Sequence, residues 1–317
     1  MIPLALIEDA LVYANLLLML TVGFTLTYLI AKIPNFAHGE FAGIGVYITF
    51  TVAQVWKSNP YLAVPLAFII SAFSGALIYN GVLRTLKRFG GTMISLTIST
   101  LAMQIMISAL LNIYADYLYP IAGAYSRLFL FRHLDFEFIG LPGVLIVSTI
   151  FLLTLITLLH LMLTRTRFGI SLRAVVEDSS LASILGVNVE LACTISWMLT
   201  AGIAGVAGSL LPLWFQGHPY TGSMLLTSVF AASILGGLSS IYGAMIGAYI
   251  IGLTEIFGTY LLAQTFGAQL TAYRSLIPLT ILCIVLLIFP RGITGLIEDL
   301  QARRASKAMV KIRGEGS

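Results

Sequence analysis

The sequence predicts an all-α, polytopic membrane protein with about eight to ten transmembrane or re-entrant helices. Of its 317 residues, 59% are hydrophobic and only 9% are charged, whereas a soluble domain has about 25% charged residues. The 17 basic and 13 acidic residues are too few to cover the surface of a soluble fold of this size. The mean hydropathy of +0.99 agrees with this assignment.

Apolar runs of the length needed to cross a membrane, about 20 residues, occur along the whole chain. They cover residues 10–31, 61–83, 91–113, 142–163, 193–215 and 274–290. A shorter run that contains glycine covers 39–56. The stretch 224–257 is too long for one span, so we divide it at the break 236–240. These runs make nine apolar segments, and the sequence leaves open how many of them cross.

The basic residues predict the orientation of the chain, because Lys and Arg resist translocation. Alternation of the segments places 13 of the 17 basic residues on one side, including those of the tail 291–317. That side and the C-terminus are therefore predicted to be cytoplasmic. The N-terminus is external if all nine segments cross and internal if one is re-entrant. The basic residues predicted on the opposite side are Lys57, Arg127, Arg132 and Arg274.

No soluble domain or leader is expected. The longest polar stretches are 114–141, 164–192 and the tail, so residues 1–317 are expected to form a single transmembrane domain. No basic region precedes the first apolar run, so a cleaved signal peptide is not expected.

Catalytic and metal-binding motifs are lacking in the sequence. It contains no G-x-S-x-G, H-E-x-x-H or G-K-[ST] motif, and the two cysteines and four histidines lack the spacing of a metal site. We expect no enzymatic activity, cofactor, metal or nucleic-acid partner. If ATP drives this protein, another chain must bind it.

Two interruptions of the apolar pattern lie at 33–39 and 236–243. Paired broken segments in two halves of a chain indicate an internal repeat in transporters. Irregular backbone at membrane depth is stable only where it is buried in protein or lines a wet cavity. We therefore expect a translocation pathway near these breaks, with the candidate residues Asn35, His38, Gly39, Glu40, Gly236, Gly237, Ser239 and Glu255.

The roles of the polar candidates stay open at this point. Glu40 and Glu255 lie inside apolar segments, where a charge is costly. Neither has a basic residue three or four positions away, so its partner must come from another helix. They form either a proton or cation relay or interhelical hydrogen bonds. Asn35 either lines the pathway or caps the next helix, and His38 either lines the pathway or hydrogen-bonds a neighbour.

A polar stretch at 114–141 is predicted to be an external loop rich in aromatic residues. Such residues form an interfacial belt or a docking surface for an external partner. They are Tyr114, Tyr117, Tyr119, Tyr125, Phe129, Phe131, Phe136 and Phe138.

The cytoplasmic stretch 165–188 alternates short apolar faces with the polar run 177–180. This pattern is typical of short helices that lie on the membrane surface with one face free for a partner, and equally of an ordinary interfacial connector.

Several motifs resemble those of branched-chain amino-acid ABC transporter permeases, the family of LivH and LivM subunits. The coupling loop of that family has the approximate form T-x-x-G-x-x-x-R-A, an acidic residue, then A-x-x-x-G-[IV]-N. It is matched by Thr166, Gly169, Arg173, Ala174, Asp178, Ala182, Gly186, Val187 and Asn188.

Three further segments support the resemblance. Residues 35–40 with 43–47 are similar to the H-type subunit. Residues 236–244 resemble G-G-x-G-S-x-x-G-A, with Ser239 in place of a glycine, and Glu255 matches the glutamate that follows. Residues 289–295 resemble the terminal R-P-x-G-[LI]-x-G, with the proline and arginine exchanged.

The resemblance implies an inner-membrane pore subunit of an importer for branched-chain or related amino acids. The implied partners are two ABC ATPase subunits, a second LivM-like permease, an extracytoplasmic substrate-binding protein and membrane lipid. It also implies that the loop receives the movement of the ATPase through Gly169, Arg173, Ala174, Glu177, Asp178, Ala182, Gly186 and Asn188. The alternatives are a permease of the same superfamily for urea, short amides or sugars, and an ion-coupled secondary amino-acid transporter that works alone.

Overall fold

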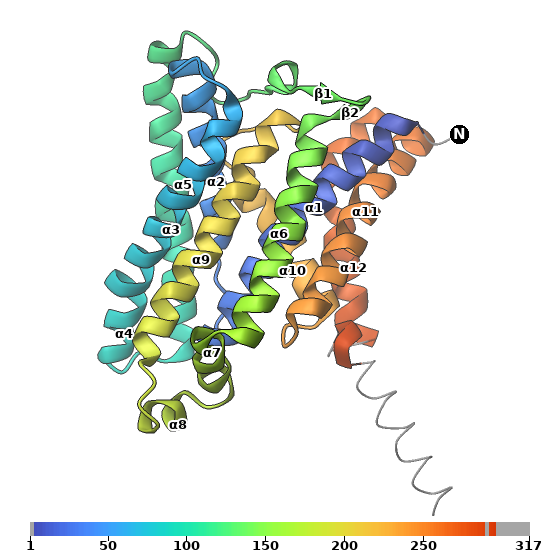
Figure 1. Cartoon of the computed structure of the whole chain (residues 1–317). Coiled ribbons are helices and arrows are strands. Elements are labelled where there is room, and N and C mark those ends of the chain that lie inside the picture. The colour runs from blue at the N-terminus through green and yellow to red at the C-terminus, as the bar shows by residue number, and fades with distance from the viewer. Residues whose placement is uncertain (1–2, 289–291, 296–317) are drawn as a thin grey trace, which may run out of the picture.

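The structure is a computed structural model that describes residues 3–288 and 292–295. The tail 296–317 and the first three residues of the motif at 289–295 lie outside the described residues. The chain forms a bundle of helices with one small hairpin (Figure 1). Its first half contains α1 (Leu4–Ala31), α2 (His38–Phe50), η1 (Thr51–Val55), η2 (Pro60–Leu62), α3 (Ala63–Ile78), η3 (Tyr79–Leu83), α4 (Arg84–Arg88) and α5 (Met93–Ala122).

The second half begins with a short loop segment and the hairpin. Its elements are η4 (Arg132–Leu134), β1 (Glu137–Phe138), β2 (Leu141–Pro142), α6 (Gly143–Arg165), α7 (Arg167–Glu177), α8 (Ser179–Ile184), α9 (Val189–Leu210), η5 (Leu211–Leu213), α10 (Thr221–Gly236), α11 (Ile241–Phe266), η6 (Ala268–Tyr273) and α12 (Leu276–Ile288). The elements η1 and η3 are π-helical turns that continue α2 and α3.

Among the described residues, seven helices are long and apolar enough to cross a membrane, and α10 is a shorter apolar helix. Together with α2, which η1 prolongs, they account for the nine predicted apolar segments. The prediction of an all-α, polytopic membrane protein is confirmed. The division of 224–257 into two segments is also correct, since α10 ends at Gly236 and α11 begins at Ile241.

Two predicted boundaries are wrong. The span predicted at 91–113 ends too early, because α5 continues to Ala122. Tyr114, Tyr117 and Tyr119 therefore lie on a helix and not in a loop. The first span begins earlier than predicted, because α1 includes Glu8 and Asp9. In both cases the helix extends beyond its apolar part, since helix formation by the backbone does not require apolar side chains.

The order of a long, a short and a long helix occurs twice, as α1–α2–α3, where η2, η3 and α4 prolong α3, and as α9–α10–α11. Extensive helix contacts join the two sets crosswise, α3 with α9 and α1 with α11. Helix α1 begins at the end of the bundle where the N-terminus lies, and α9 begins at the opposite end, beside α8 (Figure 1). The two sets run in opposite directions, and the first helix of each set packs against the last helix of the other. This arrangement agrees with the predicted internal repeat.

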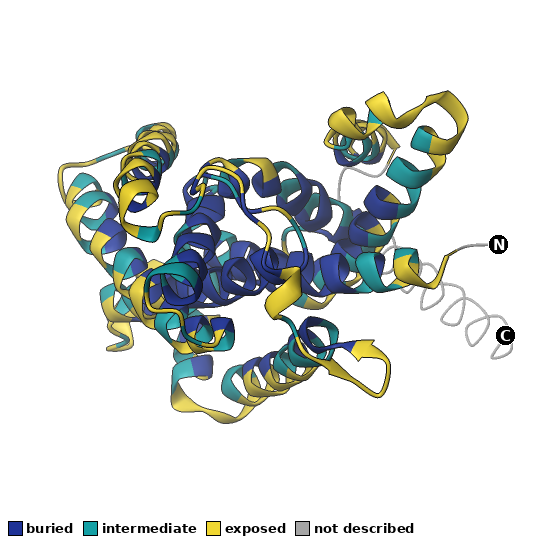
Figure 2. Cartoon of the chain, turned by 90° about the horizontal axis from the view of Figure 1, so that it is seen from above, coloured by how far each residue is buried: buried dark blue, intermediate teal, exposed yellow. Residues whose placement is uncertain are grey.

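The centre of the bundle is packed closely through small residues. A Cβ atom on Gly45 of α2 would lie 2.0 Å from the carbonyl oxygen of Gly205 on α9, and one on Gly208 would lie 2.0 Å from that of Ala42. Only glycine permits these backbones to approach so closely, which is how helices gain contact in lipid. Figure 2 shows that buried residues gather in the central helices and that exposed ones face outward on the peripheral helices.

The two ends of the bundle differ in charge. The basic end holds α4, α7 and α8 and thus Arg84, Lys87, Arg167 and Arg173, whereas the hairpin end holds β1 and β2 (Figure 1). Helix α1 begins at the hairpin end, and the last described turn of α12 lies toward the basic end. This arrangement agrees with nine alternating segments, the case that the sequence left open.

Candidate functional site

The break between α1 and α2 is buried, and its polar side chains shape the turn. Asn35 is fully buried, and its Oδ1 accepts a hydrogen bond of 3.1 Å from the Ala37 amide. The carbonyl oxygen of Pro34 accepts a hydrogen bond of 3.2 Å from Thr100 on α5. The Asn35 side chain therefore closes a turn just before α2, whose N-cap residue is Ala37 without a side-chain cap, so Asn35 is not the cap of that helix. Its Nδ2 has no hydrogen-bond partner among the described residues.

His38 begins α2 and is fully buried. Its Nε2 lies 2.9 Å from the carbonyl oxygen of Leu20, and the ring meets Phe24 edge to face. This geometry matches the interpretation in which His38 hydrogen-bonds a neighbour, here one on α1.

Glu40 connects α2 to α10. Its Oε1 accepts a hydrogen bond from the Ser223 hydroxyl, while its buried Oε2 has no partner among the described residues. Directly before these two residues, Gly39 and Gly222 bring the same two helices together, since a Cβ atom on Gly39 would lie 2.2 Å from the Gly222 carbonyl oxygen. The partner of Glu40 therefore comes from another helix, as expected, and it is a hydroxyl group.

The second break is a tight connection between α10 and α11 toward the basic end (Figure 1). Gly237 has a φ of +97°, and a Cβ atom on Gly236 would lie 2.2 Å from the Gly243 carbonyl oxygen. Ser239 is exposed and has no left-handed backbone, so the turn does not require a glycine at that position. The Ser240 hydroxyl accepts a hydrogen bond from the Gly243 amide and caps α11.

Glu255 lies in the middle of α11 and is only 3% exposed. Its Oε1 accepts hydrogen bonds from the Tyr13 hydroxyl at 2.9 Å and from Arg274 Nε at 2.6 Å. Its Oε2 accepts one from the Ser228 hydroxyl at 2.7 Å. These contacts join α11 to α1, to α10 and to the segment before α12.

Arg274, which the sequence assigns to the external side, has a partner that the sequence did not indicate. Its side chain is 28% exposed and pairs with Glu255. Tyr13, Ser223 and Ser228 are carboxylate partners that the sequence did not indicate. Their positions give no signal, because Tyr13 and Ser228 lie 242 and 27 positions from Glu255, and Ser223 lies 183 positions from Glu40.

The predicted pathway residues thus form three groups. The first break and Glu40 lie together near the α2–α10 contact, and Glu255 forms a separate cluster with α1, α10 and the segment before α12. The second break contributes backbone geometry and no buried charge. Helix α10 joins the two carboxylates, because it supplies a serine to each.

The loop 165–188 folds into α7 and α8 at the basic end. Gly169 packs against the end of α6, where a Cβ atom would lie 2.2 Å from the Met162 carbonyl oxygen. The Asp178 carboxylate accepts hydrogen bonds from the Ser180 and Leu181 amides, at 2.8 and 3.0 Å, and so caps α8. Four of the predicted coupling residues, Gly169, Asp178, Gly186 and Asn188, therefore determine the shape of the loop.

The C-terminal end of the loop is attached to α9. Gly186 has a φ of +86°, and Asn188 Oδ1 accepts a hydrogen bond of 3.0 Å from the Leu191 amide to cap α9. In the first turn of α9, Glu190 forms ion pairs with Arg84 and Arg88 of α4. The loop is thus attached at one end to α6 and at the other to both α9 and α4.

The surface of α7 and α8 combines buried anchors with an exposed apolar face. Ala182 is buried, while Arg173 and Glu177 are exposed and Ala174 is half-buried. Ile184 and Leu185 are 81% and 73% exposed. These exposed apolar side chains are available for contact with a partner or with the membrane surface, the two alternatives that the sequence leaves open.

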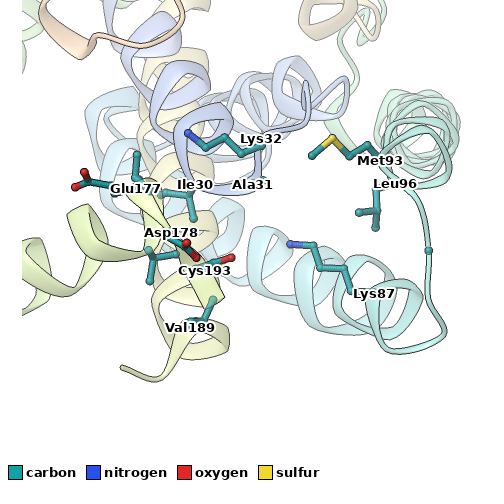
Figure 3. A pocket seen from close by; sticks show the side chains of 14 residues that line it. Ile30, Ala31, Lys32, Lys87, Met93, Leu96, Glu177, Asp178, Val189 and Cys193 are labelled. Atoms are coloured by element: carbon teal, nitrogen blue, oxygen red, sulfur yellow. The ribbon is translucent and has the colours of Figure 1, made fainter. Parts of the chain in front are cut away.

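A cavity of about 440 Å³ separates this loop from α4 and α5. Figure 3 shows Lys32 and Lys87 on one side of it and Glu177 and Asp178 on the other. The loop is therefore not packed solidly against the rest of the basic end.

The aromatic segment at the hairpin end is partly inside the protein. Phe129 and Phe131 are buried, and the Phe129 ring packs against Phe50 of α2 with 4.7 Å between the centroids. They are therefore core residues. Tyr114 is half-buried, and the other members of the predicted belt or docking surface are exposed. Arg132 lies over the Trp214 ring at 3.7 Å. Arg127 donates two hydrogen bonds to Asp116. These hydrogen bonds, together with the attraction between the two opposite charges, raise the pKa of the Arg127 guanidinium.

Known proteins resemble this chain over most of its length. Residues 6–286 match the protein family described as "Branched-chain amino acid transport system / permease component". The probable branched-chain amino acid transport permease protein LivH of Methanocaldococcus jannaschii is 42% identical over 289 residues, which are 91% of each chain. No solved structure matches the chain.

Two bacterial relatives are more distant. The high-affinity branched-chain amino acid transport system permease protein BraD of Pseudomonas aeruginosa is 29% identical over 87% of this chain and 91% of its own. The corresponding LivH protein of Escherichia coli is 28% identical over 87% of this chain and 90% of its own. The chain therefore belongs to the branched-chain amino acid transport permease family, as an H-type member.

Proposed function

We propose that this chain is the H-type permease subunit of an ABC importer for branched-chain or related amino acids. The single observation that carries the proposal is the loop 165–188, which has the family's motif and presents an exposed apolar face at the basic end. The names of the relatives support the solute class.

In this proposal the chain is one permease domain, 1–317, of a larger assembly in the inner or cytoplasmic membrane. Its partners are two ABC ATPase subunits, a second LivM-like permease and an extracytoplasmic substrate-binding protein. The basic end and the tail 291–317 face the cytoplasm, because basic residues resist translocation. The chain hydrolyses no ATP itself and forms part of the translocation pathway.

Movement of the ATPase pair is transmitted through α7 and α8. The exposed face at Ile184 and Leu185 binds the ATPase, and the capped ends of the loop pass the displacement to α6 and α9. Helix α9 packs on α2 and α3, so its movement changes the centre of the bundle. States that interconvert in this way differ by only a few kcal/mol and are biased by nucleotide and solute.

Purification of the tagged chain from native membranes tests the proposal. We expect a Walker-type ATPase and a second permease to copurify, and the reconstituted complex to import leucine only with ATP and the binding protein. A chain that purifies alone and moves amino acids along an ion gradient without ATP would contradict the proposal. In that case Glu40 and Glu255 become the first candidates for ion coupling.

A further inference from the structure

A second cavity lies beside the Glu255 cluster and has a volume of about 250 Å³. It is formed by α1, by the connection between α9 and α10, by α10 and α11, and by the segment from η6 to α12. Tyr13, Glu255 and Arg274 line it together with Gln216, His218 and Thr221. Since Tyr13 lies in the first half of α1, the cavity is nearer the hairpin end, which the proposed orientation places outside.

The lining of the cavity contains a positively charged and a negatively charged side chain close to each other. Arg274 Nε donates to Glu255 Oε1 at 2.6 Å, and the guanidinium carbon lies 4.1 Å from the centre of the Tyr13 ring. The two charges compensate each other, so the cavity is neutral overall and suits a neutral or zwitterionic solute. A single buried charge, in contrast, would favour an ion of the opposite sign.

Arg274 and Glu255 both retain unused hydrogen-bonding positions. Arg274 Nη2 is buried and has no hydrogen-bond partner among the described residues. Glu255 Oε1 accepts two hydrogen bonds, whereas Oε2 accepts one, from Ser228. A carboxylate oxygen has two acceptor positions, so the pair retains a donor for a carboxylate and an acceptor for an ammonium group.

One wall of the cavity is apolar. Its side chains are Leu211, Phe215, Met224 and Leu225. Binding cavities for small molecules combine an apolar lining with a few polar groups that orient the ligand.

We propose that this cavity is a transit site for the imported amino acid, in which Arg274 binds the α-carboxylate, Glu255 binds the α-ammonium group and the apolar wall receives an aliphatic side chain. The inference rests on the proposed function, since it assigns a place in the chain to the solute. A purely structural ion pair is the competing explanation. Such a pair gains little stability over apolar residues of similar size, and an unpaired buried donor adds a further cost that a bound carboxylate removes.

The test measures binding of radiolabelled leucine to the whole complex in lipid nanodiscs without the binding protein. Two competitors separate the charges: 4-methylpentanoate has the carboxylate alone, and 3-methylbutylamine has the ammonium group alone. Arg274→Lys keeps the positive charge but removes the planar guanidinium, and with it the Nη2 group that would bind the carboxylate. We expect it to weaken leucine and 4-methylpentanoate about tenfold, or about 1.4 kcal/mol, while 3-methylbutylamine binds as before.

The matched control is Arg132→Lys, because Arg132 also lies toward the hairpin end and stacks on an aromatic ring but does not line this cavity. It is expected to bind all three compounds as the wild type does. Should Arg274→Lys fail to assemble, the double variant E255Q/R274Q removes both charges at once and leaves no uncompensated ion. Assembly should then be retained and leucine binding lost.

The inference is overturned if the wild-type complex imports leucine but shows no saturable leucine binding, or if Arg274→Lys or the double variant binds leucine as tightly as the wild type. A weakening of all three compounds together, with a lower melting temperature, would show a structural ion pair and overturn it as well. Failure of the proposed function is seen separately, in a wild-type complex that imports no amino acid with ATP and binding protein.

Discussion

Glu40 and Glu255 show how a buried carboxylate is tolerated in this bundle. Glu255 has three donors, from Tyr13, Ser228 and Arg274, whereas Glu40 has one, from Ser223. The two sites therefore respond differently to loss of a hydroxyl group, although each receives one from α10.

Ser223→Ala leaves Glu40 without a partner among the described residues, while Ser228→Ala leaves Glu255 with two. An unsatisfied buried polar group costs about 1–3 kcal/mol. We expect the melting temperature of the purified protein to fall clearly for Ser223→Ala and less for Ser228→Ala. Adding Glu40→Gln to Ser223→Ala should recover part of the loss, because a neutral amide is cheaper to bury. Equal effects of the two serine changes would contradict this assignment.

Gly208 is one of two residues, with Gly45, at which α2 and α9 approach each other most closely. An added Cβ atom would meet the Ala42 carbonyl oxygen at 2.0 Å, and backbone cannot move aside as a side chain does. Gly208→Ala should therefore lower the melting temperature, since overpacking costs about 1–3 kcal/mol or more.

Gly81→Ala is the matched control for that change. Gly81 is also helical and has nothing within 4 Å of an added Cβ atom, so alanine there should be neutral or stabilising. Thermal unfolding in detergent, followed by size-exclusion chromatography, compares the two variants. A Gly208→Ala protein as stable as Gly81→Ala would show that the close approach of α2 and α9 is absent.

At the level of single elements, α7 and α8 have an exposed apolar face at the basic end. Ile184 and Leu185 contribute little to the stability of the permease, because they are largely exposed. Ile184→Asp should therefore leave the melting temperature unchanged and reduce copurification of the ATPase by about tenfold, the effect of placing a charge in an apolar contact.

Ile139→Asp provides the control for the ATPase contact. Ile139 is 85% exposed at the hairpin end and has a positive φ, which Asp tolerates better than Ile. It should bind the ATPase as the wild type does. Loss of the ATPase in both variants would indicate a general defect in assembly and argue against a specific contact on α8.

For the whole molecule, the direction of the bundle in the membrane can be tested with single cysteines. Cys193 and Cys283 are free, so a background without cysteine is made by changing both to Ser or Ala. An impermeant thiol reagent should label Ile139→Cys in intact cells, and Ser183→Cys on α8 only after the membrane is opened. The reverse pattern would place the basic end outside and contradict the orientation drawn from the basic residues.

The crosswise packing of α1 with α11 and α3 with α9 gives the bundle two similar halves around the short helices α2 and α10. The two carboxylates and the proposed transit site all involve α10. In the proposed function, a displacement of α9 reaches Glu40 through α2 and the Glu255 cluster through α1, because α9 packs against both helices.

The sequence by itself determined the all-α membrane class, the nine apolar segments and the two breaks. These follow from local composition, since about 20 apolar residues or a Gly-rich interruption can be recognised without knowledge of the rest of the chain. The family followed from motifs in a fixed order, such as 35–40 and 165–188.

Only the tertiary structure decided which polar groups meet. Tyr13 and Glu255 are 242 positions apart, and Glu40 and Ser223 are 183 apart, so no periodicity in the sequence relates them. Arg274 shows the reason most clearly: its neighbours in the chain predict only the side on which it lies, and the pairing of its guanidinium with Glu255 is seen only in the folded bundle. Pairing of buried charges depends on distances between helices, and those distances are determined by packing.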